Sequence, residues 1–426
     1  MRVGDLVEQL LGRDLPVRLE AWDGTALGPE DASAKIVIRS FDAIRRIVQT
    51  AVGDLVSLSP PGELGFARAY VAGDLDIEGD IFQVLALRDR LPNVKLGARQ
   101  LLDLARTLGI DDLKPLPPPP EEIILRGRRH SKERDAAAIA AHYDAGNDFY
   151  ATFLGSTMTY SCAVFERDDM TLDEAQTAKY ELICRKLGLQ PGMRLLDVGC
   201  GWGGMVMHAA QHHGVRAVGV TLSRSQQELA TKRVYEAGLS ELVEIRYQDY
   251  RDVADGPYDA ISSIGMFEHV GEARTGEYFT DLYRLLRPQG RLLNHAIARP
   301  PFKGRAAVHP RGFIHRYVFP DGELLEVGTV VTAMQGAGFE VRHEESLREH
   351  YARTLRHWVA NLEQNWDEAT RQSSEARARI WRLYMAGSAV LFEAGQTQIH
   401  QVLGVRLDGG ASGMPNRPRW DREPLL

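Results

Sequence analysis

The sequence predicts a doubly wound α/β domain, in which helices cover both faces of a parallel sheet, preceded by a smaller α+β domain. Short apolar, partly β-branched runs alternate with helical stretches after residue 194, as in parallel sheets buried on both faces. A glycine-rich turn follows the first of these runs. The proline run Pro115–Pro120 stands before all of them and favours a stiff, extended spacer. These observations predict two domains.

The amino-terminal elements come first. Lys35–Ile38 predicts a strand, and Phe41–Val52 predicts a helix with one apolar face. We place an α+β domain at residues 1–114, associated with lipid or substrate, and a proline-rich linker with a basic segment at 115–134. This region shows no obvious chemistry of its own.

The second domain is predicted over residues 135–407. Its expected strands are Leu195–Val198, Ala217–Val220, Val243–Tyr247, Ala260–Ile264 and Leu292–Ile297. A helical pattern follows from Glu349 to about Gln401. Residues 408–426 are polar and rich in glycine and proline, so we expect a flexible tail.

Composition excludes several classes of protein. A net charge of −7 and a pI of about 6.0 argue against a nucleic-acid binder, which needs a basic balance. The first residues lack a signal-peptide pattern, and no apolar run approaches the ~18 residues of a membrane span. The chain has three cysteines without paired short spacings, so we expect no disulfide framework and no metal site. A reducing cytoplasm fits these features.

The glycine turn is the sharpest local signal. It runs from Leu195 through Asp197, Gly199 and Gly201 to Gly204, where a strand enters a helix expected to begin near Met205. Glycines let the backbone turn tightly and approach a ligand closely. The same residues satisfy G-x-G-x-x-G, so a dinucleotide is one interpretation. A turn that only closes a strand–helix connection is another.

The next two strand ends distinguish the ligands. A dinucleotide site needs an acid after the second strand to bind the ribose, but that strand ends in Thr221-Leu222-Ser223. The nearest acid at a strand end, Asp249, follows the third strand and suits the exocyclic amine of an adenine. S-adenosylmethionine (SAM) therefore fits this turn better than a dinucleotide.

At this point the sequence resembles the cyclopropane-fatty-acid synthase and mycolic acid methyltransferase family over about residues 140–405. The matching motifs are Ala141-His142-Tyr143-Asp144, Gly146-Asn147-Asp148, Met158–Ala163, Asp197–Gly204, Thr221-Leu222-Ser223 with Gln226, Gln248-Asp249-Tyr250, Met266–Gly271, His295 and His350–Leu355. The region before Pro115 is more loosely similar to the extra domain of the bacterial members that act on phospholipids. The resemblance implies a class I SAM-dependent methyltransferase fold.

The resemblance also implies which residues surround two ligands. The SAM set is Tyr160, Ser161, Asp197, Gly199, Gly201, Thr221, Gln226, Gln248, Asp249 and Tyr250. A bicarbonate ion is implied beside the transferred methyl, held by Cys162, Glu268, His295, Ile297 and Tyr351. Many relatives carry a cysteine where this chain has Ser388, so a mechanism that uses that thiol is excluded here.

These residue types suit methyl addition to an alkene. An isolated double bond is a poor nucleophile, so it must be held in line with the methyl in a dry site. Aromatic faces stabilise the resulting carbocation, and we name four candidates: Tyr143, Phe149, Tyr160 and Phe267. A small, oriented base then removes a proton. Taken singly, each site residue is as readily explained as an ordinary core or surface residue, and Cys162 need not act as a thiolate.

The substrate expected from the resemblance is an unsaturated acyl chain of a membrane phospholipid. The product is a cyclopropane ring or a methylene branch, and an inactive protein that binds lipid or SAM is the alternative from another class. The basic run Arg126–Arg134 is either a solvated surface or a contact to an anionic membrane. We expect a cytoplasmic protein at the inner face of the membrane; a homodimer, the double-bond position and the headgroup stay open.

Overall fold

The computed structural model describes residues 2–12, 14–57, 62–87, 116–125, 127, 129–143, 145–301 and 312–420. Its contacts divide the chain into two compact units. The first joins the amino-terminal residues, up to Ile124, to two later segments that end at Pro320 and Val390. The second holds the rest of the chain. The predicted domains were continuous in sequence, whereas each of these units is built from separate segments.

The first unit contains a four-stranded sheet with the strand order β2-β1-β3-β4. Its amino-terminal elements are α1 (Val3–Leu11), β1 (Arg18–Ala21), β2 (Ala26–Leu27), β3 (Ala34–Ile38), α2 (Phe41–Ser57), α3 (Glu63–Val71), β4 (Leu75–Gly79) and α4 (Ile81–Ala86). The later segments add α12 (Phe313–Tyr317), α15 (Trp366–Gln372) and most of α16 (Glu375–Glu393). The predicted strand and helix of this region are both present.

Arginines of α16 attach it to this unit. Arg379 donates hydrogen bonds to the carbonyls of Tyr70 and Leu75 at 3.0 and 3.2 Å, and Arg382 donates to Ile77 at 2.8 Å. Glu122, which follows the proline run, is buried, and its two carboxylate oxygens accept a bidentate pair from Arg68, both at 3.0 Å. This pair attaches the linker to α3 at Glu122.

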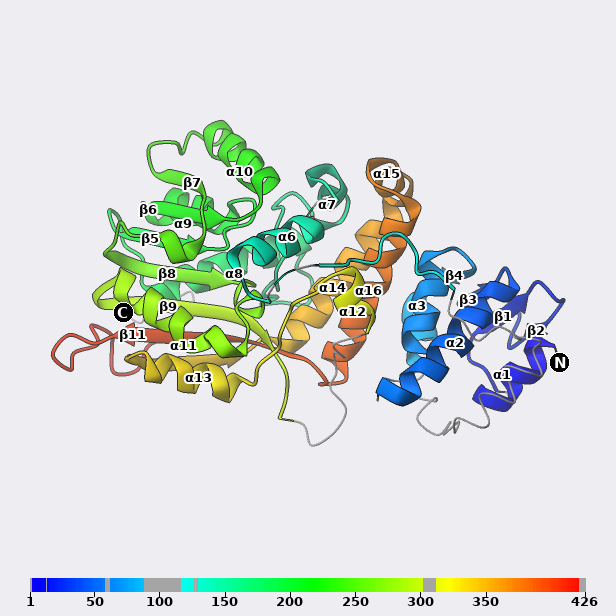
Figure 1. The fold of residues 1–426 in the computed structure, drawn as a ribbon. Coiled ribbons are helices and arrows are strands. Elements are labelled where there is room, and N and C mark those ends of the chain that lie inside the picture. Colours follow the sequence, from blue (N-terminus) through cyan, green and yellow to red (C-terminus); the bar gives the residue numbers. More distant parts are fainter. Residues whose placement is uncertain are drawn as a thin grey trace. The chain divides into compact units, whose positions relative to one another are not determined.

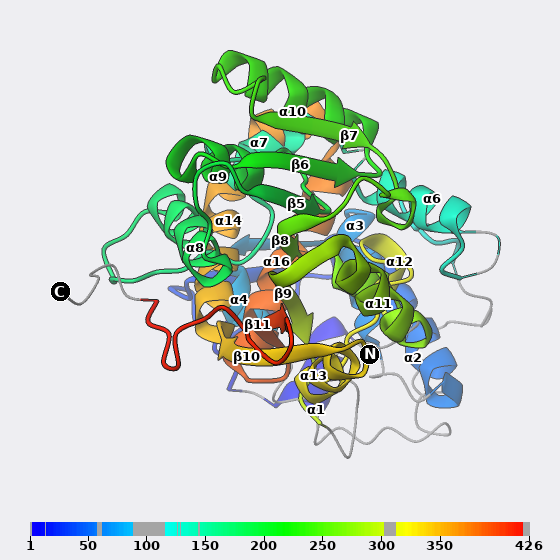
Figure 2. The ribbon, with the colours of Figure 1, turned by 90° about the vertical axis from the view of Figure 1, so that its left-hand side faces the viewer.

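The second unit contains a seven-stranded sheet with the order β10-β11-β9-β8-β5-β6-β7 (Figure 2). The strands are β5 (Arg194–Val198), β6 (Arg216–Thr221), β7 (Val243–Tyr247), β8 (Tyr258–Ile264), β9 (Leu286–Ala298), β10 (Phe339–Ser346) and β11 (Gln398–Arg406). The first five pair in parallel, which confirms the five predicted strands. β11 pairs antiparallel with β9 and β10, so the sheet is mixed.

Helices cover both faces of this sheet (Figures 1 and 2). Buried apolar side chains of α8 (Leu172–Leu187), α9 (Gly204–His213) and α10 (Arg224–Glu236) form one core, and those of α11 (Thr275–Leu285) and α13 (Val327–Gly336) form another. The remaining helices are α6 (Lys132–Tyr143), α7 (Asn147–Leu154) and α14 (Arg348–Gln364), with short 3-10 turns η2 (Tyr250–Asp252), η3 (Phe267–His269) and η4 (Glu272–Arg274). The doubly wound prediction is confirmed.

One prediction about the carboxyl-terminal part differs from the structure. The helical pattern predicts a helix to about Gln401, but α16 ends at Glu393 and Gln398–Arg406 is a strand. Within the tail, Ser412 accepts a hydrogen bond from Arg342 at 3.0 Å and the Trp420 ring centroid lies 5.5 Å from that of His343, and the flexibility of the tail stays a prediction. Residues 421–426 lie outside the described residues. No helix in the described ranges is long and apolar enough to span a membrane.

Candidate active site at the carboxyl edge of the sheet

The glycine turn connects β5 to α9 and shapes an open space. Gly199 and Gly201 have φ angles of 80° and 54°, a region that side chains disfavour. A Cβ on Gly199 would lie 2.9 Å from the Met266 side chain, whereas one on Gly201 would meet nothing within 4 Å. Gly199 is thus required by packing and conformation, and the backbone at Gly201 is accessible to a ligand.

Asp197 lies at the end of β5 beneath this turn. Its carboxylate is buried and accepts a hydrogen bond from the Ser262 hydroxyl at 2.6 Å. Burial raises the pKa of Asp197 to about 6. This hydrogen bond joins β5 to β8. It accounts for the position of the Asp197 side chain without any contact to a ligand.

The predicted SAM residues at the next strand ends are already hydrogen-bonded to neighbours. Thr221 donates to the Gln226 amide oxygen at 2.8 Å. Arg251 donates to both carboxylate oxygens of Asp249, at 2.8 and 2.6 Å. Burial alone would raise the pKa of Asp249, but the bonds from Arg251 lower it below its usual value. Asp249 is therefore an ionised acceptor with lone pairs left for an amine.

The other two predicted residues of this edge flank Asp249. The Gln248 side chain donates to the Asp252 carbonyl at 2.8 Å. The half-buried Tyr250 ring lies edge-on to Tyr278, with centroids 5.3 Å apart. The structure thus brings Thr221, Gln248 and Tyr250 to the same sheet edge as the glycine turn.

The four aromatic candidates separate into two groups. Phe149 is fully buried against Tyr150, and Phe267 is 4% exposed in the apolar core. Tyr143 and Tyr160 are only half-buried, with centroids 6.5 Å apart. The two tyrosines therefore remain the candidates for an aromatic wall, because the phenylalanines are explained by core packing.

Glu268 stands in η3, just beyond β8. Gly265, the residue after β8, donates a hydrogen bond to the His295 carbonyl of β9. Two residues further along β9, the N–H of Ile297 donates to Glu268 Oε1 at 2.7 Å. Glu268 Oε2 is buried without a hydrogen-bond partner among the described residues. Burial raises the pKa of Glu268 to about 7, because the hydrogen bond from the Ile297 N–H offsets only part of the cost of desolvating the charge.

His295 lies on β9 and is completely buried. Its Nδ1 lies 3.0 Å from the Gln401 amide nitrogen, and the Gln401 amide oxygen accepts from Lys186 at 2.7 Å. Since Lys186 can only donate, the orientation of the Gln401 amide is fixed and His295 Nδ1 must accept. Burial holds the pKa of His295 well below its usual value, so the neutral ring carries its proton on Nε2. Within the described chain that nitrogen has no partner.

Cys162 contacts the start of α14, the helix that carries Tyr351. Cys162 Sγ lies 3.7 Å from the carbonyl of Leu347, the residue before α14, and the Thr354 hydroxyl of α14 accepts from the next N–H, that of Ala163, at 3.0 Å. Burial raises the pKa of the Cys162 thiol, so it is not a thiolate. Tyr351 is buried on α14, with its ring centroid 4.8 Å from that of Phe392.

Sequence reasoning missed four buried polar residues that support the predicted ones. Lys179 and Gln176 of α8 donate to the Ser161 hydroxyl and carbonyl, at 2.8 and 2.9 Å. Burial lowers the pKa of Lys179 to about 7. Gln401 and Lys186 orient His295 as described above. Their only sequence signal is a polar residue on an otherwise apolar helix face or strand.

The basic run has acidic neighbours. Arg129 and Arg134 both pair with Asp321, at 3.1 and 2.6 Å, and Lys132 pairs with Asp252 at 2.7 Å. Arg126 and Arg128 lie outside the described residues. Much of the described positive charge is therefore balanced within the chain.

Some relatives match nearly the whole chain, and others match about two thirds of it. A probable fatty acid methyltransferase of Mycobacterium tuberculosis is 45% identical over 417 residues, 95% of each chain. A tuberculostearic acid methyltransferase of the same species is 34% identical over 91% of this chain and 87% of its own. A mycolic acid cyclopropane synthase solved with S-adenosylhomocysteine is 38% identical, with a TM-score of 0.59, over 63% of this chain and 98% of that one.

These similarities agree with the geometry. Structural similarity to cyclopropane synthases confirms the predicted class I methyltransferase fold. The family model for mycolic acid cyclopropane synthetase matches residues 130–402, which contain the glycine turn, Glu268, His295 and Tyr351. The chain belongs to this family of SAM-dependent methyltransferases.

Proposed function

We propose that this enzyme methylates the cis double bond of unsaturated acyl chains in membrane phospholipids and closes a cyclopropane ring. The alkene π electrons form the bond to the SAM methyl as its bond to sulfur breaks, which leaves S-adenosylhomocysteine and a carbocation. A C–H bond of the new methyl then breaks, and its electrons close the ring. Full-length similarity to fatty acid methyltransferases supports a fatty acyl substrate.

One observation carries the proposal for proton removal: two buried polar atoms, Glu268 Oε2 and His295 Nε2, lack partners among the described residues. Buried polar groups normally have partners, since leaving one unpaired costs free energy. His295 Nε2 donates and Glu268 Oε2 accepts, which suits a small ion with both a hydroxyl and an anionic oxygen. Bicarbonate fits this donor–acceptor pair and, when bound, supplies the base. Glu268 would accept its hydroxyl proton, and His295 and Tyr351 would donate to its oxygens.

The remaining site residues would hold SAM and the carbocation. We assign SAM to the open backbone at Gly199–Gly201, with Asp249 accepting from the adenine amine. Tyr143 and Tyr160 offer half-buried rings to the cation. Calorimetry with SAM and with NAD tests the first assignment: SAM binding is expected, and a preference for NAD would overturn it.

The decisive experiment incubates the protein with SAM and either vesicles of mixed unsaturated phospholipids or free unsaturated fatty acids, each with and without added bicarbonate. Mass spectrometry and NMR then identify the modified chains. We expect cyclopropane rings on phospholipid acyl groups, formed faster with bicarbonate. Modification of free fatty acids alone would contradict the phospholipid assignment, and rates independent of bicarbonate would contradict the proposed base.

A second candidate shares every early step. In it, a hydride shift within the carbocation precedes proton loss and gives a methylene branch instead of a ring. The full-length similarity to a tuberculostearic acid methyltransferase favours it. The same NMR spectra distinguish the products, because a ring methylene and an olefinic methylene have separate resonances.

A further inference from the structure

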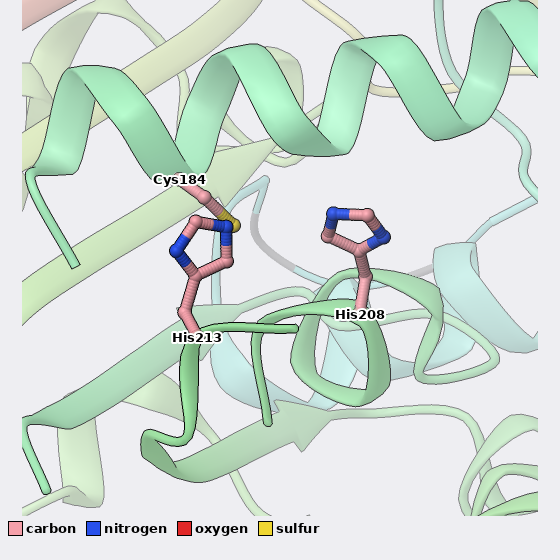
Figure 3. Close-up of side chains that lie close together, drawn as sticks. All are labelled: Cys184, His208 and His213. Atoms are coloured by element: carbon pink, nitrogen blue, oxygen red, sulfur yellow. The ribbon is translucent and has the colours of Figure 1, made fainter. Parts of the chain in front are cut away.

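A cluster of metal-binding residue types lies between α8 and α9, apart from the site described above. Glu181 and Cys184 stand one turn apart on α8, His208 lies in the middle of α9, and His213 is the last residue of α9. Figure 3 shows both imidazoles rising from α9 toward the Cys184 sulfur. One ligand atom from each of Cys184, His208 and His213 lies within 4.8 Å of the others.

The carboxylate of Glu181 completes the cluster. Its Oε2 lies 3.4 Å from His208 Nε2 and 3.0 Å from His213 Nε2. Glu181 and both histidines line an open hollow of about 650 Å³, while Cys184 is buried behind them. An ion could therefore enter from the hollow and meet the sulfur at its inner end.

The donor set also suits a cation. Imidazole nitrogens, a carboxylate oxygen and a cysteine sulfur are the ligand types that zinc binds. A bound metal would displace the proton of the Cys184 thiol.

We propose that Cys184, His208, His213 and Glu181 form a tetrahedral Zn²⁺ site that joins α8 to α9. Sulfur, imidazole and carboxylate ligands in this number are what zinc selects. In a tetrahedral site, ligand atoms are about 3.3 to 3.6 Å apart, so small side-chain rotations close the observed cluster. Cysteine spacing alone predicts no metal site, whereas this set combines one cysteine with residues of other types from two helices.

The site bears on the enzyme through the elements it joins. α9 begins directly after the glycine turn, and α8 also carries Lys179, which donates to Ser161. A zinc ion would thus brace the two helices that support the predicted SAM pocket. Its ligands touch neither Glu268 nor His295 in any described hydrogen bond, so metal binding can be measured without the methyl transfer.

The test uses the full chain freed of metal by a chelator and titrated with Co²⁺. We expect one equivalent to give a thiolate-to-cobalt charge-transfer band with tetrahedral d–d bands, which Zn²⁺ then abolishes by displacement. Zn²⁺ should also raise the melting temperature by roughly 3 to 5 °C at ~100-fold excess over its Kd. A spectrum with octahedral bands and no charge transfer would overturn the proposal.

Variants separate this site from adventitious binding. Cys184→Ala should lose the charge-transfer band, and the half-buried His213→Gln should weaken Co²⁺ binding at least tenfold while folding normally by circular dichroism. The matched control is His212→Gln, which removes the neighbouring histidine of the same helix and should keep both the band and the thermal shift. Equal loss in His212→Gln and His213→Gln, or unchanged binding in folded Cys184→Ala, would refute this ligand set. A protein inactive toward lipid but positive here would refute only the proposed function.

Discussion

The two halves of the candidate active site differ in whether their buried polar groups have hydrogen-bond partners. At the ends of β5 to β7, Asp197, Thr221 and Asp249 are each bonded to a neighbouring side chain. Beyond β8 and on β9, Glu268 and His295 each keep one buried atom without a partner among the described residues. The first half is thus a preformed surface shaped by backbone and glycine. The second is an incomplete network that a small ion would complete, and substitutions should separate the two.

The largest effect is expected from Glu268→Gln. Glutamine keeps the size and can still accept from the Ile297 N–H, but it removes the charge that would receive the bicarbonate proton. Turnover should fall by at least ~10²-fold, while SAM affinity by calorimetry changes little. Added bicarbonate should rescue poorly, since the defect is in orientation and not in supply. Wild-type initial rates of SAM consumption would remove this carboxylate from the mechanism.

Gln401 is a positioning residue, and Gln401→Glu reverses its role. A carboxylate can only accept, so it would place the His295 proton on Nδ1 and leave Nε2 unable to donate to an anion. We expect kcat to fall by about 10- to 100-fold, with SAM affinity preserved. The pH profile should shift as well, because the added carboxylate raises the pKa of His295, and below that pKa the charged imidazole again carries a proton on Nε2. Gln401→Leu leaves either tautomer accessible and should cost less; equal losses in both variants would indicate a structural role only.

Substitutions in the glycine turn should weaken SAM binding and leave the methyl-transfer step itself unchanged. Gly199→Ala places a Cβ 2.9 Å from Met266 at a φ of 80°, which should displace the turn and weaken SAM binding by roughly tenfold or more. Gly192→Ala is the matched control, since its φ is 83° and its Cβ would meet nothing within 4 Å. Equal loss of SAM affinity in both folded variants would assign the effect to general destabilisation.

This contrast also explains what the sequence could predict. The glycine turn and the five parallel strands can be predicted from local patterns, because a turn and an apolar run each depend on residues that are adjacent in the sequence. Strand β10 was missed because Phe339–Ser346 is rich in charge, as expected of a strand at the sheet edge. Strand β11 was read as the end of a helix, since its pairing with β9 is a long-range contact that no local pattern encodes.

The candidate site shows the same contrast between local patterns and long-range contacts. Glu268 and His295 could be placed near the glycine turn, because both belong to the carboxyl edge of a parallel sheet. The tautomer of His295 could not be predicted, since it depends on Gln401 and Lys186, which are distant in sequence and meet it only in the fold. The zinc cluster was missed for the same reason.

A smaller effect is expected at Cys162. Its sulfur is buried beside the carbonyls of Ala163 and Leu347, and the raised pKa of the thiol makes it a poor nucleophile. Cys162→Ala and Cys162→Ser should therefore retain measurable turnover, reduced mainly by the loss of packing. Complete loss of activity in both folded variants would return a catalytic thiol to consideration.

The smallest effect is expected from the basic run. Replacing Arg126, Arg128 and Arg129 with Gln removes three charges, each contributing about 1 kcal/mol at an anionic surface when it is free. Arg129 already pairs with Asp321, so its share should be smaller than that. We expect a modest weakening of binding to anionic vesicles and a reduced dependence on salt, measured by co-sedimentation, with SAM affinity unchanged. The control is Lys232→Gln on α10, which removes an exposed charge elsewhere. Vesicle binding equal to that of the wild type would make the run a solvated surface, because a membrane contact must lose affinity when its charges are removed.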